Sequence, residues 1–121
     1  MKMVNGVEWH AAAAAAFTLL LNSRARLVST EAVLLECGNA DARRPNRDDI
    51  VELRIRLAET GALFQPTADE LERAWQDYRA KTTGVSGIVD NLSFLLMRRL
   101  NLSVAFTNDK HFIKAGFQVL F

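Results

Sequence analysis

Three carboxylates lie within or directly after apolar segments of the chain. Glu36 stands in the segment 33–37, and Asp90 is in the first turn of the apolar segment 88–100. Asp109 follows another short apolar run. An unpaired carboxylate in a protein interior costs on the order of several kcal/mol, even after its surroundings relax. We therefore expect each of these acids to have a partner.

A shared metal ion is one such partner. If the three acids converge, their mutual repulsion raises their pKa values unless a cation joins them. An all-oxygen ligand set suits hard ions such as Mg²⁺ or Mn²⁺. Each acid also has a purely structural explanation: Asp90 and Asp109 could serve helix N-termini, and Glu36 could pair with Arg98 or Arg99. The combination of the three acids favours the metal site.

Other reactive residue types give weaker signals. His10 and His111 are far apart and lack the spacing of metal ligands, so His111 is expected to pack or to cap a helix. Cys37 is expected to be a small buried residue. Trp9 and Trp75 are expected to be packing residues, and no glycine-rich phosphate loop of known spacing is present.

A short basic stretch is the best local candidate for phosphate contacts. The chain has 15 Lys and Arg and 14 Asp and Glu, which gives a net charge of +1. The composition therefore does not indicate nucleic-acid binding. Any RNA contact must then come from a patch. Arg43, Arg44 and Arg47 form such a patch on a loop, with no acid between Arg43 and Asp48.

The elements that must position these residues alternate along the chain. The pattern predicts helices over residues 7–22, 31–42, 47–60, 68–81, 88–100 and 109–115, and strands over residues 26–29, 62–65, 103–107 and 118–121. Thr30 and Thr67 are suitable N-caps, and Gly61 suits a helix end. Such alternation indicates an α/β fold with a largely parallel sheet, in which ligands bind beyond the carboxyl ends of the strands.

Length and composition indicate one domain. The chain has 121 residues, half of them hydrophobic, which is enough for a core. A single cysteine cannot form an internal disulfide, which favours a reducing compartment. The apolar run 11–21 is too short to span a membrane and is flanked by charges, so we interpret it as a helix of a cytoplasmic protein.

Three motifs, in order, resemble those of PIN-domain ribonucleases of the VapC toxin type. Residues 27–40, LVSTEAVLLECGNA, resemble the second strand and following helix of that family. Residues 88–94, IVDNLSF, resemble its S-L-T-D-C-I-S-F segment, and residues 105–117 resemble its T-x-D-x-x-F…A-G-F ending. The resemblance covers residues 9–121.

The resemblance implies a three-layer α/β fold with a largely parallel sheet flanked by helices, in a single domain over residues 1–121. It implies that Glu36, Asp90 and Asp109 are metal ligands and catalytic residues for Mg²⁺ or Mn²⁺. The implied activity is hydrolysis of RNA phosphodiester bonds by an endoribonuclease toxin. An antitoxin protein would neutralise the toxin, and a homodimer is implied.

The sequence departs from the family pattern in two places, and these departures leave two functions open. Family members begin with a strand ending in Asp-Thr-Ser, whose aspartate is a central metal ligand. Residues 3–10 here resemble the loop after that strand, so the usual first strand is expected to be missing, with Asn5 and Glu8 as the nearby polar substitutes. Gly87 and Val89 also replace a supporting serine and threonine. A weakened or inactive ribonuclease and a non-catalytic module for dimerisation or antitoxin binding both remain open.

Overall fold

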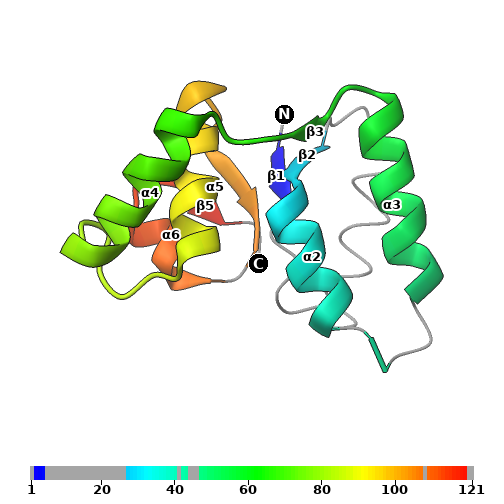
Figure 1. Ribbon diagram of the computed structural model, residues 1–121, viewed down its shortest axis with the longest axis horizontal. Helices are drawn as coiled ribbons and strands as arrows, with labels where there is room; N and C mark the ends of the chain where they lie inside the picture. Colours follow the sequence, from blue (N-terminus) through cyan, green and yellow to red (C-terminus); the bar gives the residue numbers. More distant parts are fainter. Residues whose placement is uncertain (1, 5–26, 41, 44–46, 108, 120–121) are drawn as a thin grey trace.

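A five-stranded parallel sheet forms the centre of the protein (Figure 1). The computed structural model describes residues 2–4, 27–40, 42–43, 47–107 and 109–119. The strand order is β3-β2-β1-β4-β5, and every pairing is parallel. The strands are β1 (Lys2–Val4), β2 (Leu27–Thr30), β3 (Leu63–Phe64), β4 (Val104–Phe106) and β5 (Gln118–Val119).

Helices connect the strands and flank the sheet, as the α/β interpretation predicts. They are α2 (Glu31–Ala40), α3 (Arg47–Glu59), α4 (Ala68–Ala80), α5 (Ile88–Arg99) and α6 (Lys110–Lys114). Their ends lie within about two residues of the predicted ones, which is the ordinary spread at helix termini. The predicted helix over residues 7–22 lies outside the described residues. Among the described helices, none is long and apolar enough to cross a membrane.

The predicted capping residues explain where several helices begin. The Thr30 side chain accepts a hydrogen bond from the Val33 backbone N–H at 3.1 Å, which starts α2 directly after β2. Thr67 and Glu70 form a reciprocal capping box at the start of α4, with distances of 3.0 and 2.8 Å. Gly61 adopts a φ of 70°, which permits the turn between α3 and β3.

The predicted absence of the first strand is wrong. Residues Lys2–Val4 form β1 and occupy the central place of the sheet, between β2 and β4. Met3 is paired with Val28 on one side and with Ala105 on the other. The physical reason is that an open gap would leave the backbone groups of two inner strands without hydrogen bonds, at about 1–3 kcal/mol each. Residues 3 and 4, predicted to begin a loop, belong to the strand that fills this place.

Phenylalanine side chains fix the two helices that flank the carboxyl end of β4. Phe94 of α5 contacts Phe112 of α6 edge-to-face, with ring centroids 4.8 Å apart, and stacks on Phe117 at 5.8 Å. All three are buried, together with Val28 and Met97. This packing holds α5 and α6 rigidly against each other.

A second, aliphatic cluster holds α2 and α3 on the sheet. It consists of Leu27, Leu34, Leu53 and Leu57. Arg54 of α3 also donates to the Glu31 carboxylate at 2.8 Å, which joins α3 to the start of α2. Together the two clusters determine where each helix lies along the sheet edge.

Candidate metal centre

The predicted site residues come from helices that start at the carboxyl edge of the sheet. In Figure 1 the β4 arrow points downward, and α2 runs downward from the end of β2. Asp90 is in the first turn of α5, Asp109 precedes α6, and Glu36 is in the middle of α2. β1 ends at this edge too, and the next residue in the sequence, Asn5, lies outside the described residues.

Asp109 is held in a defined orientation just after β4. Its backbone N–H donates to the hydroxyl of the buried Thr107 at 3.1 Å. Its Oδ1 accepts a hydrogen bond from the His111 backbone N–H at 2.9 Å, which makes Asp109 the N-cap of α6. The His111 ring nitrogen Nδ1 lies 3.0 Å from the same oxygen. The helix-capping role considered for Asp109 is therefore confirmed, and the same geometry directs His111 toward the carboxylate.

Asp90 joins this pair from α5. One carboxylate oxygen each of Asp90 and Asp109 and one ring nitrogen of His111 lie within 4.8 Å of one another. All three residues are partly buried, so their polar groups are sheltered but can be reached from solvent. The N-cap of α5 is Gly87, which has no side chain, and Asp90 lies in the first turn of that helix. Two carboxylates and an imidazole at this spacing form a ligand set for a cation.

Glu36 of α2 is near enough to be affected by the charge of Asp90, but it is not one of the three residues whose ligand atoms lie within 4.8 Å of one another. Partial burial raises the pKa of Glu36 above its ordinary value, and the negative charge of Asp90 raises it further. The predicted alternative partners are wrong for a structural reason, because both lie elsewhere. Arg99 pairs with Glu70 at 2.9 Å, and Arg98 donates to the Ala115 carbonyl at 3.4 Å. The neighbour that Glu36 senses is another carboxylate.

A buried hydroxyl lies one helical turn beyond Asp90. Ser93 is fully buried, and its Oγ has no hydrogen-bond partner among the described residues. Residues three apart on a helix share a face. A buried hydroxyl without a partner normally costs stability, so a polar ligand on this side of α5 would satisfy a group that the described protein leaves open.

The predicted arginine patch is only partly described. Arg43 lies in the turn after α2 and Arg47 is the first residue of α3, and both are exposed. Arg44 lies outside the described residues. The turn that carries Arg43 is at the same end of the molecule as the carboxyl end of β4 (Figure 1).

The model of the PIN-domain family matches residues 3–118 of the chain. The chain belongs to the PIN-domain family. Its fold is similar to the crystal structure of VapC20 from Mycobacterium tuberculosis, a toxin that cleaves the sarcin-ricin loop. The TM-score is 0.75 at 24% sequence identity, over 97% of this chain and 96% of that one. A comparison with curated proteins gave no sequence match.

We call the carboxyl edge of the sheet with Glu36, Asp90, Asp109 and His111 the acidic edge. The sequence analysis missed one of these residues. His111 was expected to pack or to cap, yet its ring nitrogen reaches the Asp109 carboxylate. The expectation failed because a carboxylate and a histidine with one residue between them do not have a familiar ligand spacing. The cap geometry of Asp109 brings the ring back over the carboxylate. An Asp-x-His sequence directly after a predicted parallel strand is the signal that could have identified it.

Proposed function

We propose that this PIN domain is a metal-dependent endoribonuclease of the toxin type. The observation that carries the proposal is the cluster of Asp90, Asp109 and His111, whose ligand atoms lie within 4.8 Å of one another at the carboxyl edge of the sheet. Family membership supports the nuclease assignment. The toxin assignment is supported by the fold shared with a toxin that cleaves the sarcin-ricin loop.

The donor set fits a small divalent ion. Oxygen ligands lie about 2.0–2.6 Å from Mg²⁺ or Ca²⁺, so two ligands on opposite sides of one ion are at most roughly 5 Å apart. The 4.8 Å limit of the cluster meets this requirement. Asp109 Oδ1 is in direct contact with His111 Nδ1 at 3.0 Å, so the second carboxylate oxygen of Asp109 is the one available to an ion.

The charge distribution supports the same conclusion. Glu36 has a raised pKa, partly because the charge of Asp90 is close. A cation at this edge would offset that repulsion and allow both acids to ionise together. Asp90, Asp109 and His111 would hold the ion, and Glu36 would contribute directly or through a water molecule.

Each side chain has a separate task in phosphodiester hydrolysis. When bound, the divalent ion offsets charge on the scissile phosphate and makes water easier to deprotonate. Glu36 would accept a proton from the attacking water, because burial and the charge of Asp90 raise its pKa and make its carboxylate more basic than an ordinary one. Thr107 and the His111 backbone hold Asp109 in one orientation, so that its second oxygen stays available. A P–O bond to the water oxygen forms as the bond to the leaving ribose oxygen breaks.

The histidine would shift the choice of metal. Imidazole binds transition metals well, whereas Mg²⁺ prefers oxygen ligands. The residue that follows β1 in the sequence is Asn5 rather than an aspartate, so this edge has one negative charge fewer than the family pattern. A nitrogen donor in a less negative site favours Mn²⁺ over Mg²⁺.

The partners follow from the same assignment. RNA phosphates would contact the exposed Arg43 and Arg47, with Arg44 between them. An antitoxin protein would neutralise the nuclease, as expected for a toxin of this fold, and the toxin would act as a homodimer.

A non-catalytic module is the second candidate, and Asn5 is the observation that favours it. Calorimetric titration with Mn²⁺ and with Mg²⁺ separates the two, combined with cleavage of a sarcin-ricin loop oligonucleotide. The ribonuclease proposal predicts Mn²⁺ binding that is lost in Asp90→Asn, and cleavage that requires the ion. A chain that binds neither ion would be the non-catalytic module. Metal binding without cleavage of any RNA offered would leave the metal site standing and reject the nuclease.

A further inference from the structure

One buried side chain closes the loop between α4 and α5. Asn91 follows Asp90 on α5 and is buried. Its Nδ2 donates to the Gly87 carbonyl at 2.8 Å and to the Ser86 carbonyl at 3.3 Å. Its Oδ1 accepts a hydrogen bond from the Thr83 hydroxyl at 3.0 Å. The amide thus uses both of its donor hydrogens and its oxygen within this loop.

The rest of the loop has a defined path. The hydroxyl of the buried Ser86 donates to the Thr83 carbonyl at 3.0 Å. The Gly84 N–H donates to the Lys81 carbonyl at 2.9 Å, and a φ of 81° at Gly84 permits this reversal of the chain. Asn91 therefore joins the middle of a hydrogen-bonded loop to the start of α5.

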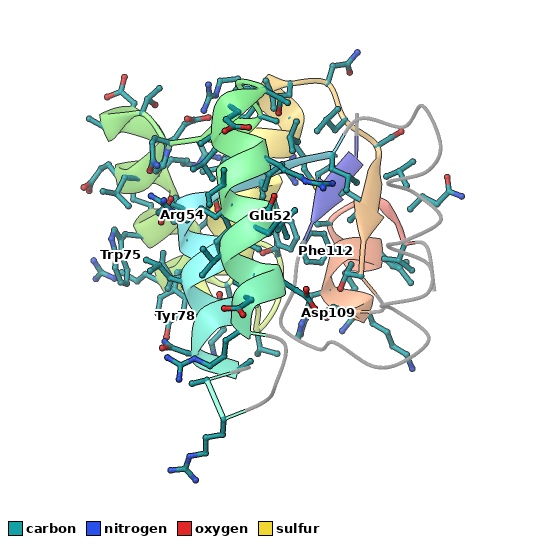
Figure 2. The ribbon with its side chains drawn as sticks, turned by 90° about the vertical axis from the view of Figure 1, so that its right-hand side faces the viewer. Glu52, Arg54, Trp75, Tyr78, Asp109 and Phe112 are labelled. Carbon is teal, nitrogen blue, oxygen red and sulfur yellow. The ribbon has the colours of Figure 1, made fainter. Side chains whose placement is uncertain are left out.

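The first turn of α5 needs such support. Helix ends fray, because the first N–H groups of a helix lack acceptors within it. Asp90 lies in this turn, and the N-cap, Gly87, has no side chain that could accept a hydrogen bond there. The aromatic packing of α5 comes one turn later, where Phe94 contacts Phe112 of α6. Phe112 lies close to Asp109 in Figure 2. The phenylalanines therefore fix α5 beyond Asp90, and the loop fixes the turn that carries it.

We propose that Asn91 is a positioning residue, which holds the first turn of α5 in place and thereby keeps Asp90 beside Asp109. The family pattern has a serine at the position of Gly87, where this chain has no side chain to support the turn. The amide of Asn91 supplies the support from the next turn of the helix. Because Asp90 acts here as a metal ligand, this role depends on the proposed function.

The size of the effect follows from the fraction of molecules in which the first turn is formed. The apparent affinity for an ion falls in proportion to the fraction of molecules whose ligands are in place. If loss of the Asn91 hydrogen bonds leaves the turn formed in about a tenth of the molecules, the Kd rises about tenfold. Groups that orient metal ligands typically contribute about 10- to 100-fold to the affinity.

Calorimetric titration of the full chain with Mn²⁺, well below the Tm of every variant, tests the role. Asn91→Ala should raise the Mn²⁺ Kd by about 10-fold or more. Thr83→Val removes a single hydrogen bond and should raise the Kd by about threefold or more. Thr83→Ser keeps the hydroxyl and should bind Mn²⁺ as the wild-type chain does. Thr82→Val changes the exposed neighbouring threonine, so it is the matched control and should leave the Kd unchanged.

Two further measurements separate positioning from general stability. Leu53→Val, in the aliphatic cluster that holds α3, should lower the Tm and leave the Mn²⁺ Kd unchanged. The backbone N–H of residue 91 donates to the Gly87 carbonyl at 3.1 Å. Without metal, exchange of this N–H, followed by NMR, should be faster in Asn91→Ala than in the wild-type chain. The N–H of the buried Met97, further along α5, should change less.

Failure of the positioning role and failure of the proposed function give different results. A wild-type chain that binds no Mn²⁺ rejects the proposed function and this role of Asn91 with it. Wild-type binding that persists in Asn91→Ala and Thr83→Val overturns the positioning role alone. An equal loss of affinity in Leu53→Val or Thr82→Val would assign the effect to general destabilisation and would overturn the role too. If Asn91→Ala does not fold, the comparison of Thr83→Val with Thr83→Ser decides.

Discussion

Two glutamates of this protein have opposite electrostatic surroundings. At Glu70, burial alone would raise the pKa, but hydrogen bonds from the Thr67 backbone and from Arg99, together with the charge of Arg99, lower it. At Glu36, burial and the charge of Asp90 both raise the pKa. Glu70 joins the capping box of α4 to α5 through Arg99, whereas Glu36 lies beside another acid at the carboxyl edge.

This difference separates an acid that has its own cation from acids that lie beside one another. The fold supplies Glu70 with a cation of its own, and that pair ties two helices together. At the acidic edge, no described arginine or lysine forms an ion pair with Glu36 or Asp109. The fold thus accepts repulsion at this edge, which an external cation could relieve. Substitutions at the acidic edge, at its arginine patch and at Glu70 test this contrast directly.

Removal of a carboxylate charge at the acidic edge should have the largest effect on RNA cleavage. Asp90→Asn and Asp109→Asn keep the side-chain shape, and asparagine at 109 can still cap α6. Each is expected to reduce metal-dependent RNA cleavage by about 100-fold or more, because each removes a ligand that stabilises the metal by several kcal/mol and about 1.4 kcal/mol is tenfold in rate. Cleavage rates and thermal unfolding should be measured together. Loss of both activity and stability would make these acids structural, like Glu70.

The second prediction concerns RNA binding by the arginine patch. Charge reversal at Arg43, Arg44 and Arg47 is expected to weaken RNA binding. The slope of log affinity against log salt should flatten by about 0.7 for each phosphate of single-stranded RNA that the variant no longer neutralises. Reversal of Arg56 at the other end of α3 serves as the control. An unchanged salt slope would assign the three arginines to solvent or to another partner.

His111 tests whether the edge is a metal site with a nitrogen donor. His111→Ala is expected to weaken Mn²⁺ binding by about 10-fold, an effect at the lower end for groups that support a metal, and to affect Mg²⁺ binding less. Calorimetry with both ions is the measurement, and Lys110→Ala on the same helix is the control. An equal loss for both ions would mean that His111 only orients Asp109.

Substitution of Glu70 or Glu36 by glutamine should give the smallest effects. The two substitutions should change the stability of the protein in opposite directions. Glu70→Gln can keep the capping hydrogen bond from the Thr67 backbone but loses the charge and the oxygen that accepts from Arg99, so it should lower stability at pH 7 by about 0.5–1 kcal/mol. Glu36→Gln removes a repulsion and should raise the metal-free Tm by about 1–3 °C, since about 1 kcal/mol corresponds to several degrees and solvent screens this site. Thermal unfolding without metal measures both.

At low pH, the stability of both variants, Glu70→Gln and Glu36→Gln, should become equal to that of the wild-type chain. Glu70 has a lowered pKa, so its contribution is present above the ordinary value of 4.5 and is lost as the pH falls through the folded value. Glu36 has a raised pKa, so its protonated form is favoured in the folded state, and that advantage is lost as the pH rises from 4.5 through the folded value. Below both pKa values each variant should match the wild-type chain. Stability changes of the same sign for the two variants at pH 7 would contradict the proposed difference between Glu70 and Glu36.

Local signals in the sequence were sufficient for most of the fold. Threonines before acidic helix starts predicted the beginnings of α2 and α4, and Gly61 predicted a helix end. The three acids were identified because carboxylates among apolar residues demand a partner. The predicted helix starts and the predicted helix end were confirmed because each depends on contacts within a few residues.

The features that were missed depend on contacts distant in the sequence. A three-residue strand such as β1 is too short for any periodicity, and its identity comes from pairing with Val28 and Ala105. Arg99 finds Glu70 rather than Glu36 only through the packing of α4 on α5. Likewise, the pattern of α4 predicts an apolar face but not whether another element covers it, so the exposure of Trp75, which was expected to pack, could not be foreseen.

The central place of β1 has a consequence for how the protein is made. β1 pairs with β4, and Val4 precedes Val104 by 100 residues. At roughly 5–20 residues per second, the ribosome needs about 5–20 s to supply the second strand. Until then β1 has an open edge, and pairings this distant along the chain also form slowly. The acidic edge contains Asp109, which follows β4, so a nascent chain cannot assemble it early. Any activity of these acids could therefore begin only after β4 has been synthesised and paired with β1.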